Sequence, residues 1–178
     1  MFLHRSNVTS FIKQKGFTLL ELLLYIATSA AILLVISGFL SVLLKARIKN
    51  QTVSDVEMQG QAVMRLMTQT IRNSSAVNSP AIGVSASSIS LNTYVPAQNP
   101  TIFDLSGGVL RITEGVGATT PLTNSRVTVS GVTFHNLSRV GSPGTVHLQF
   151  TLTRVNVSGR NEYTYSKTFT GSASLRQP

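Results

Sequence analysis

The sequence predicts an α+β fold in which a long N-terminal helix, half membrane-embedded and half amphipathic, packs on an antiparallel β-sheet head. Two observations carry this prediction. Between Phe17 and Leu44, 21 of 28 residues are apolar and Glu21 is the one charged residue. Between Asn73 and Pro178, 30 of 106 residues are Ser or Thr, and turn signals separate short runs in which apolar and polar residues alternate.

The first 44 residues predict a leader followed by a membrane helix. Residues 1–16 are polar and basic and contain no acidic residue, as is typical of a cleaved leader. No proline interrupts residues 17–44, and the dominant Leu, Ile and Ala residues favour a helix. This run exceeds the ~20 residues that cross the core of a bilayer. The sequence therefore argues against a freely soluble cytoplasmic enzyme.

Residues 45–75 predict an amphipathic continuation of the same helix. Apolar or small residues recur at steps of three and four, and polar or charged residues lie between them. We expect this helix to end near Asn73, where polar residues with low helix propensity cluster. The residues of the apolar stripe are Val53, Val56, Gly60, Val63, Met67 and Ile71.

Residues 76–178 predict a β-rich head, which would cover that stripe with one face of a sheet. Ile89 and Leu91 alternate with polar residues, and so do Val127 and Val129, after which the phase shifts at Gly131 as in a β-bulge. The most regular strand contains Val146, Leu148, Phe150 and Leu152. A last strand is expected over Tyr163, Tyr165 and Phe169, and Lys167 falls on the same face as these aromatic residues, which leaves the register there open.

The charge and the cysteine content of the chain restrict the kinds of site that it can contain. The chain has 15 basic and 6 acidic residues, a formal net charge of +9, but three basic residues precede the apolar run, three follow it at once, and those of the head are scattered. Because the two flanks of the apolar run carry equal numbers of basic residues, the positive-inside rule does not orient the helix. The chain has no cysteine, which excludes disulfides, thiolate metal sites and a cysteine nucleophile.

The junction between the leader and the helix carries the most specific pattern. It reads Lys-Gln-Lys-Gly-Phe-Thr-Leu-Leu-Glu-Leu over residues 13–22. This segment resembles the processing site of type IV pilin-like precursors, the class III signal shared by pilins and the pseudopilins of type II secretion. The resemblance spans about 30 residues and combines a basic leader, a Gly-Phe junction, a glutamate at the fifth mature position and a long apolar helix.

The resemblance implies a role for three residues. A membrane-embedded prepilin peptidase would cleave between Gly16 and Phe17, and the new amino terminus of Phe17 would be N-methylated. Glu21 would guide assembly with other pilin or pseudopilin subunits on an inner-membrane platform. The N-terminus of the precursor would lie in the cytoplasm and the head outside the membrane. In chemical terms, a carboxylate among leucines is costly in a lipid bilayer, and such residues tend to have a defined partner.

The resemblance also indicates a type of subunit. Residues 61–77 are similar to the end of the long helix in J-type minor pseudopilins and W-type minor pilins. Many major pilins carry a proline where this chain has Gly38, and many have a C-terminal disulfide loop, which is excluded here. We therefore expect a non-enzymatic minor subunit of a type IV pilus or a type II secretion pseudopilus, located in the cell membrane and then in a surface or periplasmic filament.

Other interpretations stay open at this point. A secretory signal peptide should have an apolar region of ~7–15 residues that ends at a small-x-small site, and this run is longer. An uncleaved single-pass surface protein would keep residues 1–16. A third interpretation is an anchored head that binds DNA or an exported substrate, with Arg154, Arg160 and Lys167 close to two tyrosines.

Catalytic and metal sites have little support in the sequence. The acidic residues of the predicted head, Asp104, Glu114 and Glu162, are isolated from one another, and no nucleophile motif has a base beside it. His135 and His147 could share a metal only without carboxylate ligands. We expect no enzyme activity, no cofactor and no metal.

Overall fold

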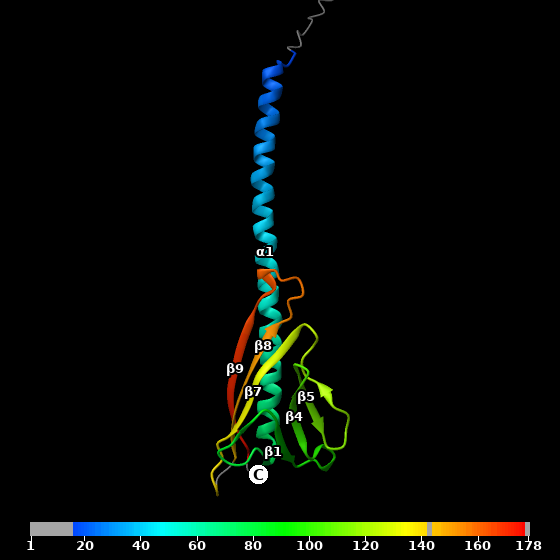
Figure 1. Ribbon diagram of the computed structural model, residues 1–178, viewed down its shortest axis with the longest axis vertical. Helices are drawn as coiled ribbons and strands as arrows, with labels where there is room; N and C mark the ends of the chain where they lie inside the picture. Colours follow the sequence, from blue (N-terminus) through cyan, green and yellow to red (C-terminus); the bar gives the residue numbers. More distant parts are fainter. Residues whose placement is uncertain (1–15, 142–143, 177–178) are drawn as a thin grey trace, which may run out of the picture. The chain divides into compact units, whose positions relative to one another are not determined.

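The computed structural model describes residues 16–141 and 144–176 of the 178-residue chain (Figure 1). Most of the predicted leader, residues 1–15, lies outside the described residues. The chain divides into two compact units, Met1–Leu44 and Lys45–Pro178, and the helix α1 (Leu19–Arg72) belongs to both. The α+β class, with one long N-terminal helix followed by antiparallel sheets, is confirmed.

The N-terminal unit contains the apolar half of α1. Thr18 caps the helix, because its Oγ1 accepts a hydrogen bond from the backbone N–H of Glu21 at 3.2 Å. Gly16 and Phe17 precede the cap and have no regular structure. Every residue from Phe17 to Leu44 is exposed, and this half of α1 is long and apolar enough to cross a membrane. Within residues 16–141 and 144–176, nothing therefore covers the apolar side chains of this half of the helix.

The distal half of α1 has the expected buried stripe. Five of the six predicted positions are buried, and Thr52 is buried in place of Val53. The helix ends at Arg72, next to the expected end near Asn73, and Ser74 already begins a strand. The hydroxyl of Ser74 donates a hydrogen bond to the carbonyl of Thr70 at 2.7 Å, which satisfies one of the last helix carbonyls.

Two antiparallel sheets form the head, where the sequence analysis expected one. The first has the strand order β1-β3-β4-β5-β6 and the second β2-β7-β8-β9 (Figure 1). The strands are β1 (Ser74–Ser79), β2 (Ser85–Ala86), β3 (Ile89–Thr93), β4 (Thr101–Ser106), β5 (Val109–Glu114), β6 (Thr120–Pro121), β7 (Val127–Asn136), β8 (Thr145–Arg154) and β9 (Ser166–Ser174). An alternation of apolar and polar residues predicts a strand but does not show which strand it pairs with. The sequence therefore could not show that the strands divide into two sheets.

Three of the predicted strands are confirmed. The alternating residues of β3, β7 and β8 point into the core, and the register of β7 shifts between Ser130 and Thr133, where Gly131 has φ +60°. The last predicted strand begins too early, because Tyr163 belongs to a short 3-10 helix and β9 starts at Ser166. Lys167 shares the inner face of β9 with Phe169, as its position in the sequence indicated.

The hairpin β4–β5 was not predicted. Ser106 pairs with Val109 across Gly107 and Gly108, both with positive φ, as a two-residue hairpin turn requires. The carbonyl of Gly108 accepts a hydrogen bond from the N–H of Val129 at 2.8 Å, which joins the two sheets. The helix and both sheets thus share one apolar core, whose largest fully buried side chains are Phe103, Phe134, Phe150, Met67, Ile71, Ile89, Leu91, Leu110, Leu148 and Leu152.

Candidate functional site

The segment ahead of the helix is open to solvent. Phe17 is 72% exposed, and a Cβ atom placed on Gly16 would have no heavy atom within 4 Å. Nothing that the described part of the chain contains therefore demands a glycine at residue 16. An extended and uncovered backbone is what a peptidase needs at the bond that it cleaves.

Glu21 lies in the first turn of α1, surrounded by exposed leucines. The positive end of the helix dipole favours a carboxylate at this position. Its oxygen Oε1 is 3.5 Å from the hydroxyl of Tyr25, one turn later, which donates a long hydrogen bond. The ring of Tyr25 contacts that of Phe17 edge-on, with 6.0 Å between their centres.

Tyr25 is a site residue that the sequence analysis missed. Its spacing of four residues from Glu21 was a readable signal, because side chains at i and i+4 meet on one face of a helix. The tyrosine brings the phenyl ring of Phe17 and the carboxylate of Glu21 to the same side of α1.

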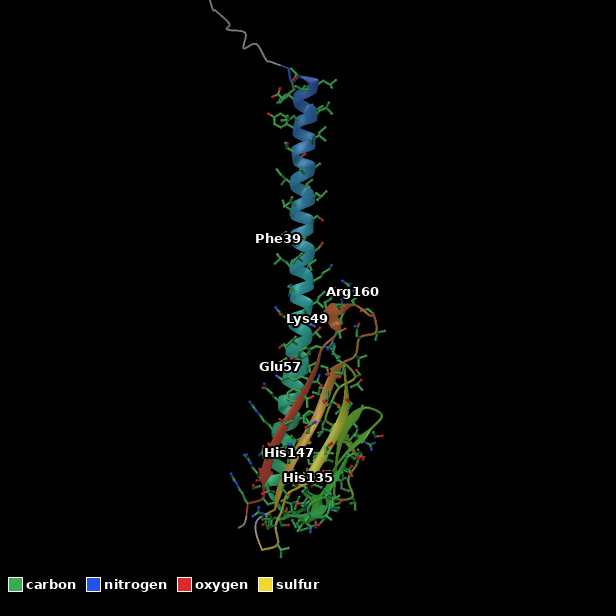
Figure 2. All side chains as sticks on the ribbon, turned by 60° about the vertical axis from the view of Figure 1, so that its left-hand side comes forward. Phe39, Lys49, Glu57, His135, His147 and Arg160 are labelled. Atoms are coloured by element: carbon green, nitrogen blue, oxygen red, sulfur yellow. The ribbon has the colours of Figure 1, made fainter. Side chains whose placement is uncertain are left out.

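The three basic residues that were candidates for DNA contact all have acidic partners. Arg154 Nη1 is 2.8 Å from Asp55 Oδ2, and Arg160 Nη2 is 2.5 Å from Glu162 Oε1. Lys167 Nζ is 2.8 Å from an oxygen of Glu57, which Figure 2 shows on α1. DNA contact by these residues stays a prediction, and their charges are already compensated by carboxylates.

The pair formed by Glu57 and Lys167 links α1 to β9. Its hydrogen bond with Lys167 lowers the pKa of Glu57 below the usual value, and a hydrogen bond from the Tyr165 hydroxyl at 3.1 Å lowers this pKa further. The same contact with Glu57 raises the pKa of Lys167. Burial raises the pKa of Tyr165, and Glu57 raises it further. Lys167 thus lies on the inner face of its strand because the helix supplies a counterion there.

His135 and His147 are direct neighbours across β7 and β8 (Figure 2). The ring nitrogen Nδ1 of His135 is 2.7 Å from the hydroxyl of Ser85, and Nδ1 of His147 is 3.0 Å from the hydroxyl of Ser172. Among residues 16–141 and 144–176, no group of three or more metal-ligating side chains comes together. The four residues form a polar row across the second sheet.

No protein family, curated protein or solved structure matches the chain. The functional argument therefore depends on the geometry described above. That geometry offers two chemical features: an uncovered backbone at Gly16 and Phe17, and a carboxylate at Glu21 on an apolar helix that has no cover of its own.

Proposed function

We propose that the chain is the precursor of a minor subunit of a type IV pilin-like filament, in a pilus or a type II secretion pseudopilus. Prepilin peptidase removes residues 1–16, Phe17 is N-methylated, and residues 17–44 enter first the membrane and then the filament core. The observation that carries this proposal is one carboxylate, Glu21, on a fully exposed apolar helix directly after an accessible Gly-Phe bond.

The exposed helix surface supports an assembly function. Between Phe17 and Leu44, 18 large apolar side chains are exposed. Each of them gains roughly 1.5–3 kcal/mol when it leaves water. The sum is tens of kcal/mol, so this segment requires lipid or the helices of other subunits around it. A filament core offers the second environment and a membrane the first.

The position of Glu21 supports a filament over a simple anchor. A carboxylate inside a bilayer costs up to roughly 3 kcal/mol on insertion scales, and in a simple anchor the helix dipole offsets less than about 1 kcal/mol of this cost. Tyr25 donates one long hydrogen bond to Oε1, which leaves the other carboxylate oxygen for an external donor. The amino terminus that cleavage creates on a neighbouring subunit is a cation of matching charge, and its pairing with Glu21 would also fix the axial register of the two helices.

The test is the mass of the mature protein after co-expression with a prepilin peptidase. We expect a chain that begins at N-methylated Phe17. The variant Gly16→Val should block cleavage, because a β-branched side chain restricts the backbone next to the scissile bond. The matched variant Lys13→Val, also in the leader, should be cleaved. An intact chain from Met1, or a chain that begins after Ala31, would contradict the proposal.

A further inference from the structure

The two sheets have four outer edge strands, and these differ in how well they are protected against pairing with another chain. Native proteins protect the edge of a sheet with short strands, proline, bulges or charges, since exposed edges pair with other chains. β2 and β6 are two residues long, and β6 contains Pro121. The register of β1 shifts twice along its pairing with β3. β9 has nine residues, pairs with β8 without any shift, and forms the outer edge of its sheet (Figure 1).

The register of β9 shows which backbone groups point outward. The carbonyl of Tyr165 accepts a hydrogen bond from the N–H of Arg154, and the N–H of Leu175 donates to the carbonyl of Gly144. These bonds alternate along an antiparallel pair. The backbone N–H and C=O groups of the odd-numbered residues of β9 therefore bond to β8, and those of the even-numbered residues point away from β8. All outward-pointing residues are exposed: Ser166, Thr168, Thr170, Ser172 and Ser174.

No charge protects this edge. The one charged residue of β9, Lys167, lies on the inner face and is bound by Glu57. The strand also has no proline and no bulge. β9 therefore presents a regular row of hydrogen-bonding groups without the devices that protect the other three edges.

A pocket with three arginines lies where β9 ends. Arg65, Arg72 and Arg176, with Thr68, Gln69 and Asn73, line a pocket of about 350 Å³. β9 and this part of α1 are adjacent, because a Cβ atom on Gly171 would lie 2.9 Å from Met64 Sδ. The N–H of Arg176 donates to the carbonyl of Arg72 at 2.9 Å. Within the described ranges, none of the three guanidinium groups has a carboxylate partner.

A structural role does not account for the whole cluster. A basic residue in the last turn of a helix interacts favourably with the helix dipole, which explains Arg72. It does not explain Arg65, which lies two turns earlier, or Arg176, which belongs to the segment after β9. Three exposed guanidinium groups around one pocket form a cationic surface that attracts an anion.

We propose that the open edge of β9 and the arginine pocket form one docking site for an extended, acidic segment of a different protein. The segment adds as a further strand to the second sheet and bonds to the outward backbone groups of β9. Its acidic side chains enter the pocket, where each guanidinium group can bind a carboxylate through two parallel hydrogen bonds.

The charge of the chain indicates that the partner is a different protein. The unit Lys45–Pro178 has five acidic residues, and four of them are paired within the chain: Asp55, Glu57, Asp104 and Glu162. A second copy with net charge +9 would bring arginines against arginines. A partner rich in acidic residues is complementary to the site. This inference concerns the head alone and does not depend on the processing of Gly16 and Phe17.

The test measures peptide binding to the full-length protein in detergent micelles by fluorescence anisotropy. The probe is a peptide of alternating valine and threonine with two glutamates at each end. We expect saturable binding that weakens at least tenfold when glutamines replace the glutamates, and likewise in the double variant Arg72→Gln, Arg176→Gln. Equal binding of the two peptides would overturn the charge recognition. Tighter binding of a single-stranded oligothymidine than of the acidic peptide would assign the pocket to nucleic acid and overturn the proposal.

Two further variants test strand addition. Thr170→Pro removes an outward N–H without removing a bond to β8 and should abolish binding, whereas Thr170→Val keeps the N–H and should bind as the original chain does. The same peptide with N-methyl groups on alternate backbone nitrogens tests this edge with the protein unchanged, so a folding defect of the proline variant does not affect the result. Unchanged binding of the methylated peptide would overturn strand addition.

Discussion

The ring of Phe169 on β9 lies directly on the backbone of α1 at Gly60. A Cβ atom added to Gly60 would be 2.0 Å from Cζ of that ring. The ring also stacks on that of Phe150, with 5.4 Å between ring centres and 19° between the planes. The phenyl ring is thus held between the helix and the neighbouring strand. Gly60 is required here because of this close approach between helix and sheet.

We therefore expect Gly60→Ala to destabilise the head. Alanine gains about 1 kcal/mol over glycine in a helix, but the added methyl group collides with the Phe169 ring, which must shift against Phe150. The free energy of unfolding should fall by roughly 1–3 kcal/mol, the usual cost of an overpacked core. Urea unfolding of the fragment 45–178 measures it. In a double-mutant cycle, Phe169→Leu should reduce the cost of Gly60→Ala, and purely additive effects would show that the ring is not the cause.

The ion pair of Glu57 and Lys167 predicts how the stability of the head depends on pH. The pKa of Glu57 is lowered in the folded head, mainly by Lys167, so the pair stabilises the head above the usual pKa of glutamate and this contribution is lost as the pH falls through the lowered value. In Lys167→Met, the loss of stability between pH 7 and pH 3 should become smaller. Urea titrations at both pH values measure it. Arg47→Met, an exposed cation, is the control and should leave the difference unchanged.

The fragment 45–178 should be soluble, rich in β-structure and free of stoichiometric metal. The core lies within this unit, and both histidines bind serine hydroxyls through Nδ1. We expect His135→Ala and His147→Ala to leave its circular dichroism spectrum and metal content unchanged, as measured by spectroscopy and elemental analysis. A metal bound at one equivalent and lost in either variant would revive the cross-strand site.

The variant Glu21→Leu should separate membrane insertion from assembly. Removal of the charge eases residence in lipid, so insertion and cleavage after Gly16 should continue. Under the proposed function, cross-linking to pilin-like subunits should fall at least tenfold, because the proposed pairing with the amine of a neighbouring chain would be lost in a low-dielectric environment. Tyr25→Phe keeps the charge and removes one long hydrogen bond, and its cross-linking should fall much less. The idea is falsified if Glu21→Leu assembles like the original chain.

The sequence predicts the fold well where one face of an element is regularly apolar. The stripe of α1 and the alternation in β8 are of this kind, and they are confirmed. The hairpin β4–β5 escapes the pattern because Asp104 and Arg111 interrupt its strands and then pair across them. Similarly, the position of Lys167 becomes understandable only with Glu57, which is 110 residues away in the chain.

The candidate sites also differ in whether the sequence alone can reveal them. Gly16, Phe17 and Glu21 form a local pattern that can be read directly from the sequence. Tyr25 is within reach of the same analysis, through its helical spacing. The arginine pocket is not, since Arg65 and Arg176 come together only when the chain segment after β9 reaches the end of α1. Local motifs can be read from one segment, but a pocket needs the tertiary fold.

The contact between the first helix and the last strand also bears on how the protein is made. A ribosome completes α1 early, but the face of α1 at Gly60 and Glu57 stays uncovered until β9 has been synthesised with Lys167 and Phe169. A nascent chain that ends before β9 lacks Phe169, Ala173 and Leu175, three residues of the buried core. The core of the head is consequently complete only when almost the whole polypeptide has been translated.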